Sequence, residues 1–268
     1  MDNLAKVVAA YELAQRNRIA TAAHLRTVQA EPELHAGEAL DALYRIEART
    51  EKWLAKEMAR RVEDHPAWPW LDRVRGVGPT LSARLLARLR IERAPTPSSF
   101  WKFCGLSTVE GARFICPGCG TALVRAQGTA APRRHHAPSG EPCLQRLEEA
   151  RAAGDVRIAA RLPSRGQVRS FDVGARTLCH LIGVSFLRRG GRYRDIYYAR
   201  RERINAQHPE WTKLHAHLAG MRIMEKLFLA HLWSVWSHAI GGPPRLAYPV
   251  WIRGKAGVDI SPWEMVET

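Results

Sequence analysis

The sequence predicts a mainly α-helical protein: a helical hairpin arm, a helical domain that contains a helix-hairpin-helix motif, and a small ribbon inserted into that domain. Three observations carry this prediction. Apolar residues recur at helical spacing through most of the 268 residues. A Gly-Val-Gly-Pro turn separates two helical patterns between residues 71 and 86. Between residues 109 and 145 the helical pattern stops, and this turn-rich stretch holds three of the five cysteines.

The N-terminal region, residues 1–64, is expected to form the helical hairpin arm. One helical pattern runs from about residue 4 to 28, a break follows at 31–32, and a second pattern runs from about 37 to 62. A short connection between two apolar stripes is typical of antiparallel helices that pack on each other. The same stripes fit a dimerising coiled coil, which would make the protein a homo-oligomer. The sequence leaves the packing arm and the dimer equally open.

Residues 65–108 contain the hairpin motif, with Leu71 and Val74 on one helical face before the turn. Gly76 and Gly78 are expected to take turn conformations that a side chain would forbid, and Pro79 suits the first turn of the next helix. Such a hairpin presents backbone N–H groups at a helix N-terminus, which favours a bound phosphate. The residues expected to contact nucleic acid here are Arg75, Gly76, Val77, Gly78, Thr80 and Arg84. An ordinary helix corner stabilised by glycine is the alternative.

The turn-rich stretch, residues 109–145, predicts a small inserted zinc ribbon. Cys116 and Cys119 have the spacing of a zinc knuckle, with glycine beside Cys119 on both sides. Cys143 would supply the third ligand, and either His135 or His136 the fourth. Four protein ligands leave no open position, so we expect a structural Zn²⁺ whose binding supplies folding energy. A degenerate ribbon or a redox Cys-x-x-Cys is the alternative, although no βαβ pattern flanks the motif.

Residues 146–240 are expected to form a helical basic core, with helices over about 144–161, 172–188 and 211–240. Between residues 188 and 203 arginines alternate with tyrosines around a glycine pair. Arginines neutralise phosphates and tyrosines stack on bases, whereas a solvated helical face is the alternative. The residues expected to contact nucleic acid here are Arg169, Arg176, Arg188, Arg189, Arg192, Tyr193 and Arg194. The tail, residues 241–268, is expected to be irregular and to dock on the body through its tryptophans.

The whole chain is strongly basic, with 41 Lys and Arg against 26 Asp and Glu and a formal net charge of +15. An excess of this size favours a polyanionic partner. No stretch approaches the roughly 20 apolar residues of a membrane span, and the polar N-terminus does not have the pattern of a secretory leader. An odd number of cysteines argues against a disulfide framework. We therefore expect a soluble cytoplasmic protein with no membrane partner.

Three segments, taken in order, carry a family resemblance. They are Leu71-x-x-Val74-x-Gly76-Val77-Gly78-Pro79, then Phe100-Trp101-Lys102-Phe103-Cys104-Gly105-Leu106, then Arg176-Thr177-Leu178 with Tyr193-Arg194-x-x-Tyr197-Tyr198. Their order resembles the C-terminal transposase domain of the bridge-RNA-guided insertion-sequence transposases, over about residues 71–106 and 167–236. The resemblance implies a DNA-binding role in transposition or recombination, in a prokaryotic cell or on a phage or other mobile element.

Two departures from that family bear on catalysis. The family carries an N-terminal RNase H-like domain with an acidic metal-binding quartet, whereas this sequence starts at the helical arm. The family also has a nucleophilic serine in a Ser-Gly pair, where this sequence has Glu110-Gly111. Ser107 and Ser139 remain as weak candidates, and neither is assigned.

These departures favour a protein that holds nucleic acid without cutting it, with DNA favoured over RNA. It would act alone or with a separate transposase or nuclease chain. A working serine-dependent transposase subunit is the first alternative. A zinc-stabilised assembly subunit that contacts only proteins is the second.

Overall fold

The computed structural model describes residues 2–30, 37–126, 134–149, 157–159, 171–242 and 260–266. As predicted, the described part of the chain is mainly helical. It divides into two compact units. The helical unit comprises Met1–Phe100 and Gly174–Thr268, and the inserted unit comprises Trp101–Val173. Among the described helices, none combines the length and apolarity needed to cross a bilayer.

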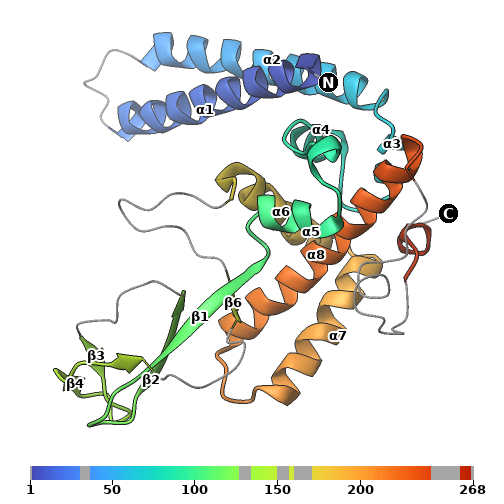
Figure 1. Cartoon of the computed structure of the whole chain (residues 1–268). Helices are drawn as coiled ribbons and strands as arrows, with labels where there is room; N and C mark the ends of the chain where they lie inside the picture. Colours follow the sequence, from blue (N-terminus) through green and yellow to red (C-terminus); the bar gives the residue numbers. More distant parts are fainter. Residues whose placement is uncertain are drawn as a thin grey trace. The chain divides into compact units, whose positions relative to one another are not determined.

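The arm is a hairpin of two long helices, α1 (Asp2–Ala30) and α2 (Gly37–Val62), which lie side by side and antiparallel (Figure 1). Glu51 of α2 accepts a hydrogen bond from Gln15 Nε2 at 2.9 Å and forms an ion pair with Arg18. Val8 and Met58 are among the side chains that the helices bury. The predicted intramolecular hairpin is therefore confirmed, while the dimer stays a prediction.

The glycine motif joins two short helices, α3 (Trp68–Leu71) and α4 (Pro79–Leu86). Trp70 is fully buried and stacks on Phe228 of the helical unit with 5.8 Å between ring centroids. Gly76 has a φ of +97°, a conformation that favours glycine. Gly78 has a φ of −79° and a ψ of 175°, which any residue adopts. The prediction that Gly78 needs a glycine-only conformation is therefore wrong, whereas Pro79 begins α4 as expected.

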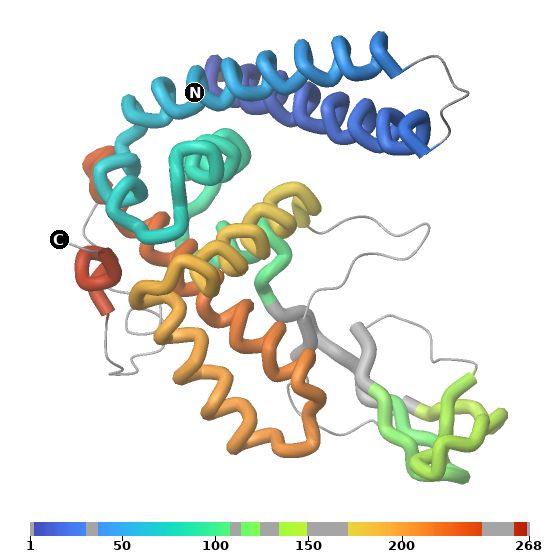
Figure 2. Tube along the Cα trace, turned by 180° about the vertical axis from the view of Figure 1, so that it is seen from behind, coloured from blue at the N-terminus to red at the C-terminus, as the bar shows by residue number. Residues whose placement is uncertain are grey.

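The remaining helices complete the helical unit. They are η1 (Ile91–Arg93), α5 (Pro97–Phe103), α6 (Val173–Arg189), α7 (Arg192–Gln207), α8 (Lys213–Ala239) and η2 (Pro262–Met265). Helices α7 and α8 run antiparallel and side by side (Figure 2). The described end of the tail contacts the helical unit, because Trp70 Nε1 donates to the Pro262 carbonyl at 2.9 Å and Met265 is buried. It is a short 3₁₀ helix rather than irregular, and the tail's Trp263 is 51% exposed, so docking through the tail's tryptophans stays a prediction.

The inserted unit is built on one long strand, β1 (Thr108–Ile115). Its antiparallel partners are β2 (Ala122–Ala126), β5 (Glu148–Glu149) and β6 (Arg157–Ala159). A separate two-stranded ladder joins β3 (His135–His136) to β4 (Pro142–Cys143). Among the described residues, Phe114, Cys116 and Leu147 form a small buried cluster in this unit.

The helix expected over residues 144–161 is wrong where the structure describes this segment. Glu148–Glu149 and Arg157–Ala159 are strands that pair with β1. Leu147 is buried against Phe114. The extended conformation therefore supplies hydrogen-bond partners for β1 and at the same time places Leu147 in the small buried cluster. This tertiary gain overrides the helical propensity of the local sequence. The inserted unit is consequently larger than the expected 109–145 ribbon.

Candidate metal centre and nucleic-acid interface

The turn between β1 and β2 forms the first half of the metal centre. The Cys116 amide donates to the Thr121 carbonyl at 2.9 Å, and the Gly120 amide donates to the Cys116 carbonyl at 3.0 Å. The Cys119 amide faces the Cys116 sulfur at 3.4 Å, as in a knuckle that turns its amides toward thiolates. Gly118 lies so close to Gln145 that a Cβ there would meet its Oε1 at 1.9 Å. The Cys-Pro-Gly-Cys-Gly sequence thus folds into a tight loop around two sulfurs.

The β3–β4 ladder forms the second half and decides which histidine joins it. His135 pairs directly with Cys143 in the ladder, so their side chains share one face. His136 points to the opposite face, where it is exposed and its Nδ1 lies 3.0 Å from the Gly140 carbonyl. Strand alternation therefore places His135 in the centre and leaves His136 outside.

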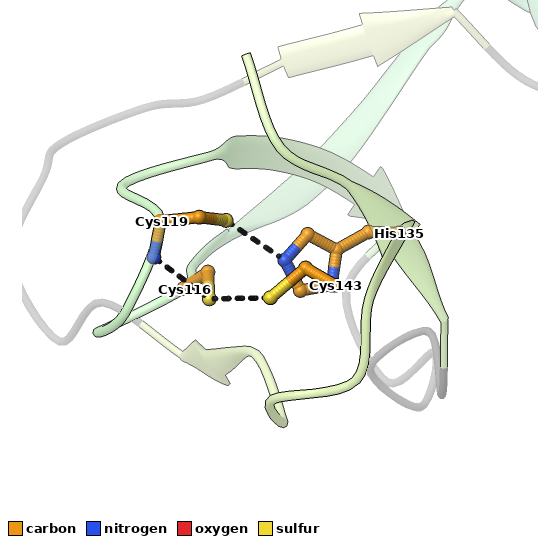
Figure 3. A group of neighbouring side chains, drawn as sticks. All are labelled: Cys116, Cys119, His135 and Cys143. Carbon is orange, nitrogen blue, oxygen red and sulfur yellow. Dashed lines mark hydrogen bonds between the residues drawn. The ribbon is translucent and has the colours of Figure 1, made fainter. Parts of the chain in front are cut away.

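Four side chains converge where the two halves meet (Figure 3). The ligand atoms of Cys116, Cys119, His135 and Cys143 all lie within 4.8 Å of one another. The Cys116 and Cys143 sulfurs are 3.8 Å apart, and the Cys119 sulfur is 3.1 Å from His135 Nε2. In the described residues no other group of three or more His, Cys, Asp or Glu side chains is arranged this way. This cluster could hold a metal ion.

Two thiols of the cluster, Cys119 and Cys143, have pKa values shifted in opposite directions. A hydrogen bond with Thr121, supported by His135 and Cys116, lowers the pKa of Cys119 to about 6. A hydrogen bond with the Gln145 backbone lowers the pKa of Cys143, but burial and the neighbouring thiols outweigh it, and the net shift is upward. The thiolate is the form of cysteine that binds a metal ion. Cys119 therefore reaches this form at a lower pH than Cys143 does.

The hairpin motif and the basic turn between α6 and α7 meet in the helical unit. Ser185 Oγ of α6 donates to the Gly76 carbonyl at 2.7 Å. Gly191, which begins the turn into α7, packs against the side chain of Arg75: a Cβ on Gly191 would lie 3.5 Å from it. Residues 75–80 and 188–192, more than 100 positions apart, therefore share one face. We call this face the hairpin–turn surface.

The hairpin–turn surface is open and basic. Gly78 and Pro79 are exposed at the N-terminus of α4, and Thr80 is half-buried. The exposed arginines on it are Arg75, Arg188, Arg189 and Arg192, and Arg194 is half-buried. The structure thus brings together most of the residues that the sequence predicted for nucleic-acid contact, although Val77 is buried beneath the turn.

Two predicted contact residues, Tyr193 and Arg176, are not exposed on the hairpin–turn surface. Tyr193 is 3% exposed, its ring stacks on Phe186 at 4.7 Å, and its hydroxyl lies 2.8 Å from His231 Nδ1. The prediction that Tyr193 contacts nucleic acid is therefore wrong, because its ring has no open face. Arg176 is half-buried near Glu225, whose pKa it lowers against a larger increase caused by burial. Arg169 is outside the described residues.

Arg84 is held by the arm. Its Nε donates to Glu12 Oε1 of α1 at 3.0 Å, and Arg88 Nη2 donates to the two oxygens of the same carboxylate at 2.8 and 2.6 Å. Glu12 is not predictable as a partner of Arg84 from the sequence, since nothing in a helical pattern reveals a partner 72 residues away. Ser185 is not predictable as a partner of Gly76 for the same reason.

The two candidate serines differ in exposure. Ser139 is exposed in the turn between β3 and β4, and Ser107 is half-buried directly before β1. Neither position adds support to a catalytic role.

No protein-family model matches the chain, and no curated protein matches its sequence. The function must therefore be argued from the two sites.

Proposed function

We propose that this protein binds nucleic acid, with DNA favoured over RNA, through the hairpin–turn surface. One observation carries the proposal: the hairpin that leads into the exposed N-terminus of α4 contacts the turn between α6 and α7, and the two segments together carry four exposed arginines, Arg75, Arg188, Arg189 and Arg192. The amides of Thr80 and Leu81 precede the first intrahelical bond of α4, from the Ser82 amide to the Gly78 carbonyl. Amides in that position and the positive end of the helix dipole favour a phosphate.

The arginines extend this contact along a backbone. Arg188 and Arg189 end α6, and Arg192 begins α7, so the three guanidinium groups are carried on either side of one glycine turn. Arginine suits phosphate because its planar fork donates two hydrogen bonds at once. The net charge of +15 supplies the long-range attraction. These contacts read phosphates rather than bases, so binding through this surface would be largely independent of sequence.

We infer further that the cluster of the inserted unit holds a structural Zn²⁺. Three thiolates and one imidazole are a donor set that zinc favours. A tetrahedral site with Zn–S bonds near 2.3 Å has sulfur–sulfur edges of about 3.8 Å. The separation of the Cys116 and Cys143 sulfurs, 3.8 Å, fits that edge. Four protein ligands leave no open position for chemistry.

The family resemblance gives the proposal its biological setting. A domain similar to that of the bridge-RNA-guided transposases would hold DNA during transposition or recombination. A separate transposase or nuclease chain would then supply the cutting step. The arm would serve as a packing element or as the contact in a homo-oligomer.

A salt titration tests the binding proposal. The triple variant Arg75→Ala, Arg189→Ala, Arg192→Ala removes three exposed charges from the hairpin–turn surface. Each lost phosphate contact should reduce the slope of log K against log[salt] by about 1. The control removes three exposed arginines from the arm instead: Arg45→Ala, Arg49→Ala, Arg60→Ala. Equal losses in the two variants would show that only net charge matters and would contradict the proposal. Absence of binding by the wild type would favour the assembly subunit.

A further inference from the structure

The connection between α7 and α8 carries a ladder of three aromatic rings, which we call the ring stack. His208 and Trp211 lie 4.2 Å apart, centroid to centroid, with an interplanar angle of 9°. Trp211 and His215 lie 3.9 Å apart with an angle of 5°. Three parallel rings at these distances have the geometry of stacked nucleobases.

The backbone fixes the ladder in place. His208 is the C-terminal cap of α7, and its carbonyl accepts a hydrogen bond from the Trp211 amide at 3.0 Å. Thr212 caps the N-terminus of α8, where its Oγ1 accepts from the His215 amide at 3.2 Å. Two helix ends and one turn thus set the three rings parallel without help from the hydrophobic core.

The two outer rings of the ring stack, His208 and His215, are accessible to solvent. His215 is exposed, His208 has 43% of its side chain exposed, and Trp211 between them is half-buried. Both faces of the indole are covered by imidazoles, so the surface available to a ligand is the outer face of a histidine. His208 is partly engaged, because its Nδ1 lies 3.3 Å from Glu210 Oε1. His215 is therefore the open end.

The charges around the ring stack fit a nucleic-acid strand. Helix α7 carries five arginines against Asp195 and Glu202. On α7 and the connection that carries the stack, Arg200, Arg203 and Lys213 are exposed, as are the acidic groups Glu202 and Glu210. A flat exposed ring beside cations is the combination that binds a base and its phosphate together.

We propose that the ring stack is a binding site for one unpaired nucleobase, which stacks on the outer face of His215. The proposal rests on the nucleic-acid binding proposed above and adds to it a preference for strands with unpaired bases. A paired duplex offers no free base face along its length, so the ring stack would contribute little to duplex binding. Trp211 and His208 act as positioning residues that keep the His215 ring parallel to the indole of Trp211.

The experiment compares three variants of the full chain at one salt concentration. His215→Ala removes the outer ring at an exposed position, His215→Phe keeps an aromatic face, and Leu214→Ala removes a neighbouring side chain that is 64% exposed. Affinity is measured for a short single-stranded DNA with 2-aminopurine, for the RNA of the same sequence, and for the DNA duplex. The fluorescence of 2-aminopurine falls when the base stacks.

The expected result is specific to the single strand. His215→Ala should weaken single-strand binding about tenfold and abolish the 2-aminopurine quenching, with duplex affinity unchanged. His215→Phe and Leu214→Ala should behave as the wild type. Unchanged single-strand affinity in His215→Ala, or an equal loss for strand and duplex, would overturn the ring-stack site while salt-dependent binding by the wild type keeps the proposed function. A wild type that binds none of the three probes would overturn both. If His215→Ala loses affinity for the RNA strand alone, the result would support the ring-stack site and identify RNA, rather than DNA, as its ligand.

Discussion

At the scale of single residues, the two glycines of the hairpin have different roles. Gly76 has a φ of +97°, and a Cβ there would lie 3.3 Å from Phe186 Cδ1. We expect Gly76→Ala to lower the free energy of unfolding by about 1–3 kcal/mol, because a left-handed conformation strains any side chain. Gly78→Ser should stay within about 0.5 kcal/mol, since serine caps a helix at least as well as glycine. Urea denaturation measures both, and equal costs would contradict this account of the turn.

Two buried histidines make stability depend on pH. Burial lowers the pKa of His65 and of His231 to about 4. His231 Nε2 faces the Ile260 carbonyl, so this nitrogen carries the hydrogen and Nδ1 accepts from Tyr193. Above pH 6.5 both histidines are neutral in the folded and unfolded chain. As the pH falls from 6.5 to 4, the unfolded chain takes up protons that the fold excludes, so stability is lost by up to about 1.4 kcal/mol per pH unit for each histidine.

Glu225 has the opposite effect on the pH dependence of stability from that of the two histidines. Burial raises its pKa to about 7, against smaller opposing effects of Arg222 and Arg176. Between pH 7 and 4.5 the fold binds this proton more tightly than the unfolded chain does, so this group alone adds stability as the pH falls. Glu225→Gln should therefore steepen the acid loss, and His231→Gln should flatten it. Urea midpoints measured from pH 8 to 4.5 check both directions, and parallel curves for the two variants would contradict the assignment.

The candidate metal centre shows which single residues can be predicted from the sequence and which cannot. The spacing of Cys116 and Cys119 is enough to predict them as candidate ligands, because a knuckle needs only a local turn. The choice between His135 and His136 depends on strand register, and register is set by the partner strand rather than by either histidine. The prediction that Tyr193 is an exposed contact residue is wrong, because an aromatic residue between arginines has the same sequence pattern whether its ring is buried or exposed.

At the scale of elements, the contact between α1 and α4 links the arm to the hairpin–turn surface. Glu12 binds Arg84 and Arg88, which would otherwise add to the positive charge beside α4. We expect Glu12→Gln to raise affinity for DNA severalfold at low salt. The cost in stability should be about 1 kcal/mol or less, since these pairs are partly exposed.

The matched control is Glu57→Gln. Glu57 also binds two arginines, Arg60 and Arg61, but within α2. Filter binding at two salt concentrations separates the variants. Equal gains in affinity would point to net charge alone, and a loss in Glu12→Gln would mean that the docked arm is needed for binding.

The long helices were predictable and the short strands were not. The two helices of the arm, α6 and α8 have apolar stripes long enough to specify a helix locally. β5 and β6 have two and three residues and exist because β1 offers them a ladder. A sequence rich in alanine, arginine and glutamate gives no local sign of that partner.

At the scale of the whole molecule, metal removal should affect one unit and spare the other. The cluster of buried residues beside the metal centre is small, with Phe114, Cys116 and Leu147 as its members among the described residues, so we expect the fold of this region to depend on the metal. We expect a zinc chelator, or Cys143→Ser, to make residues within 101–173 sensitive to protease. The melting temperature of the helical unit should not change. Protease resistance of the inserted unit after metal removal would contradict a structural role for zinc.

The discontinuity of the helical unit has a consequence for its synthesis. Trp70 packs on Phe228, and Gly76 is held by Ser185, so Trp70 and Gly76 leave the ribosome before these two contacts can form. The inserted unit has all four ligands within a 28-residue span, from Cys116 to Cys143, and can close as soon as it emerges. The inserted unit can therefore fold before the hairpin motif that precedes it in the sequence, because that motif waits for α6 and α8. Nascent chains stalled after Val173 should retain zinc while Trp70 is still accessible to protease.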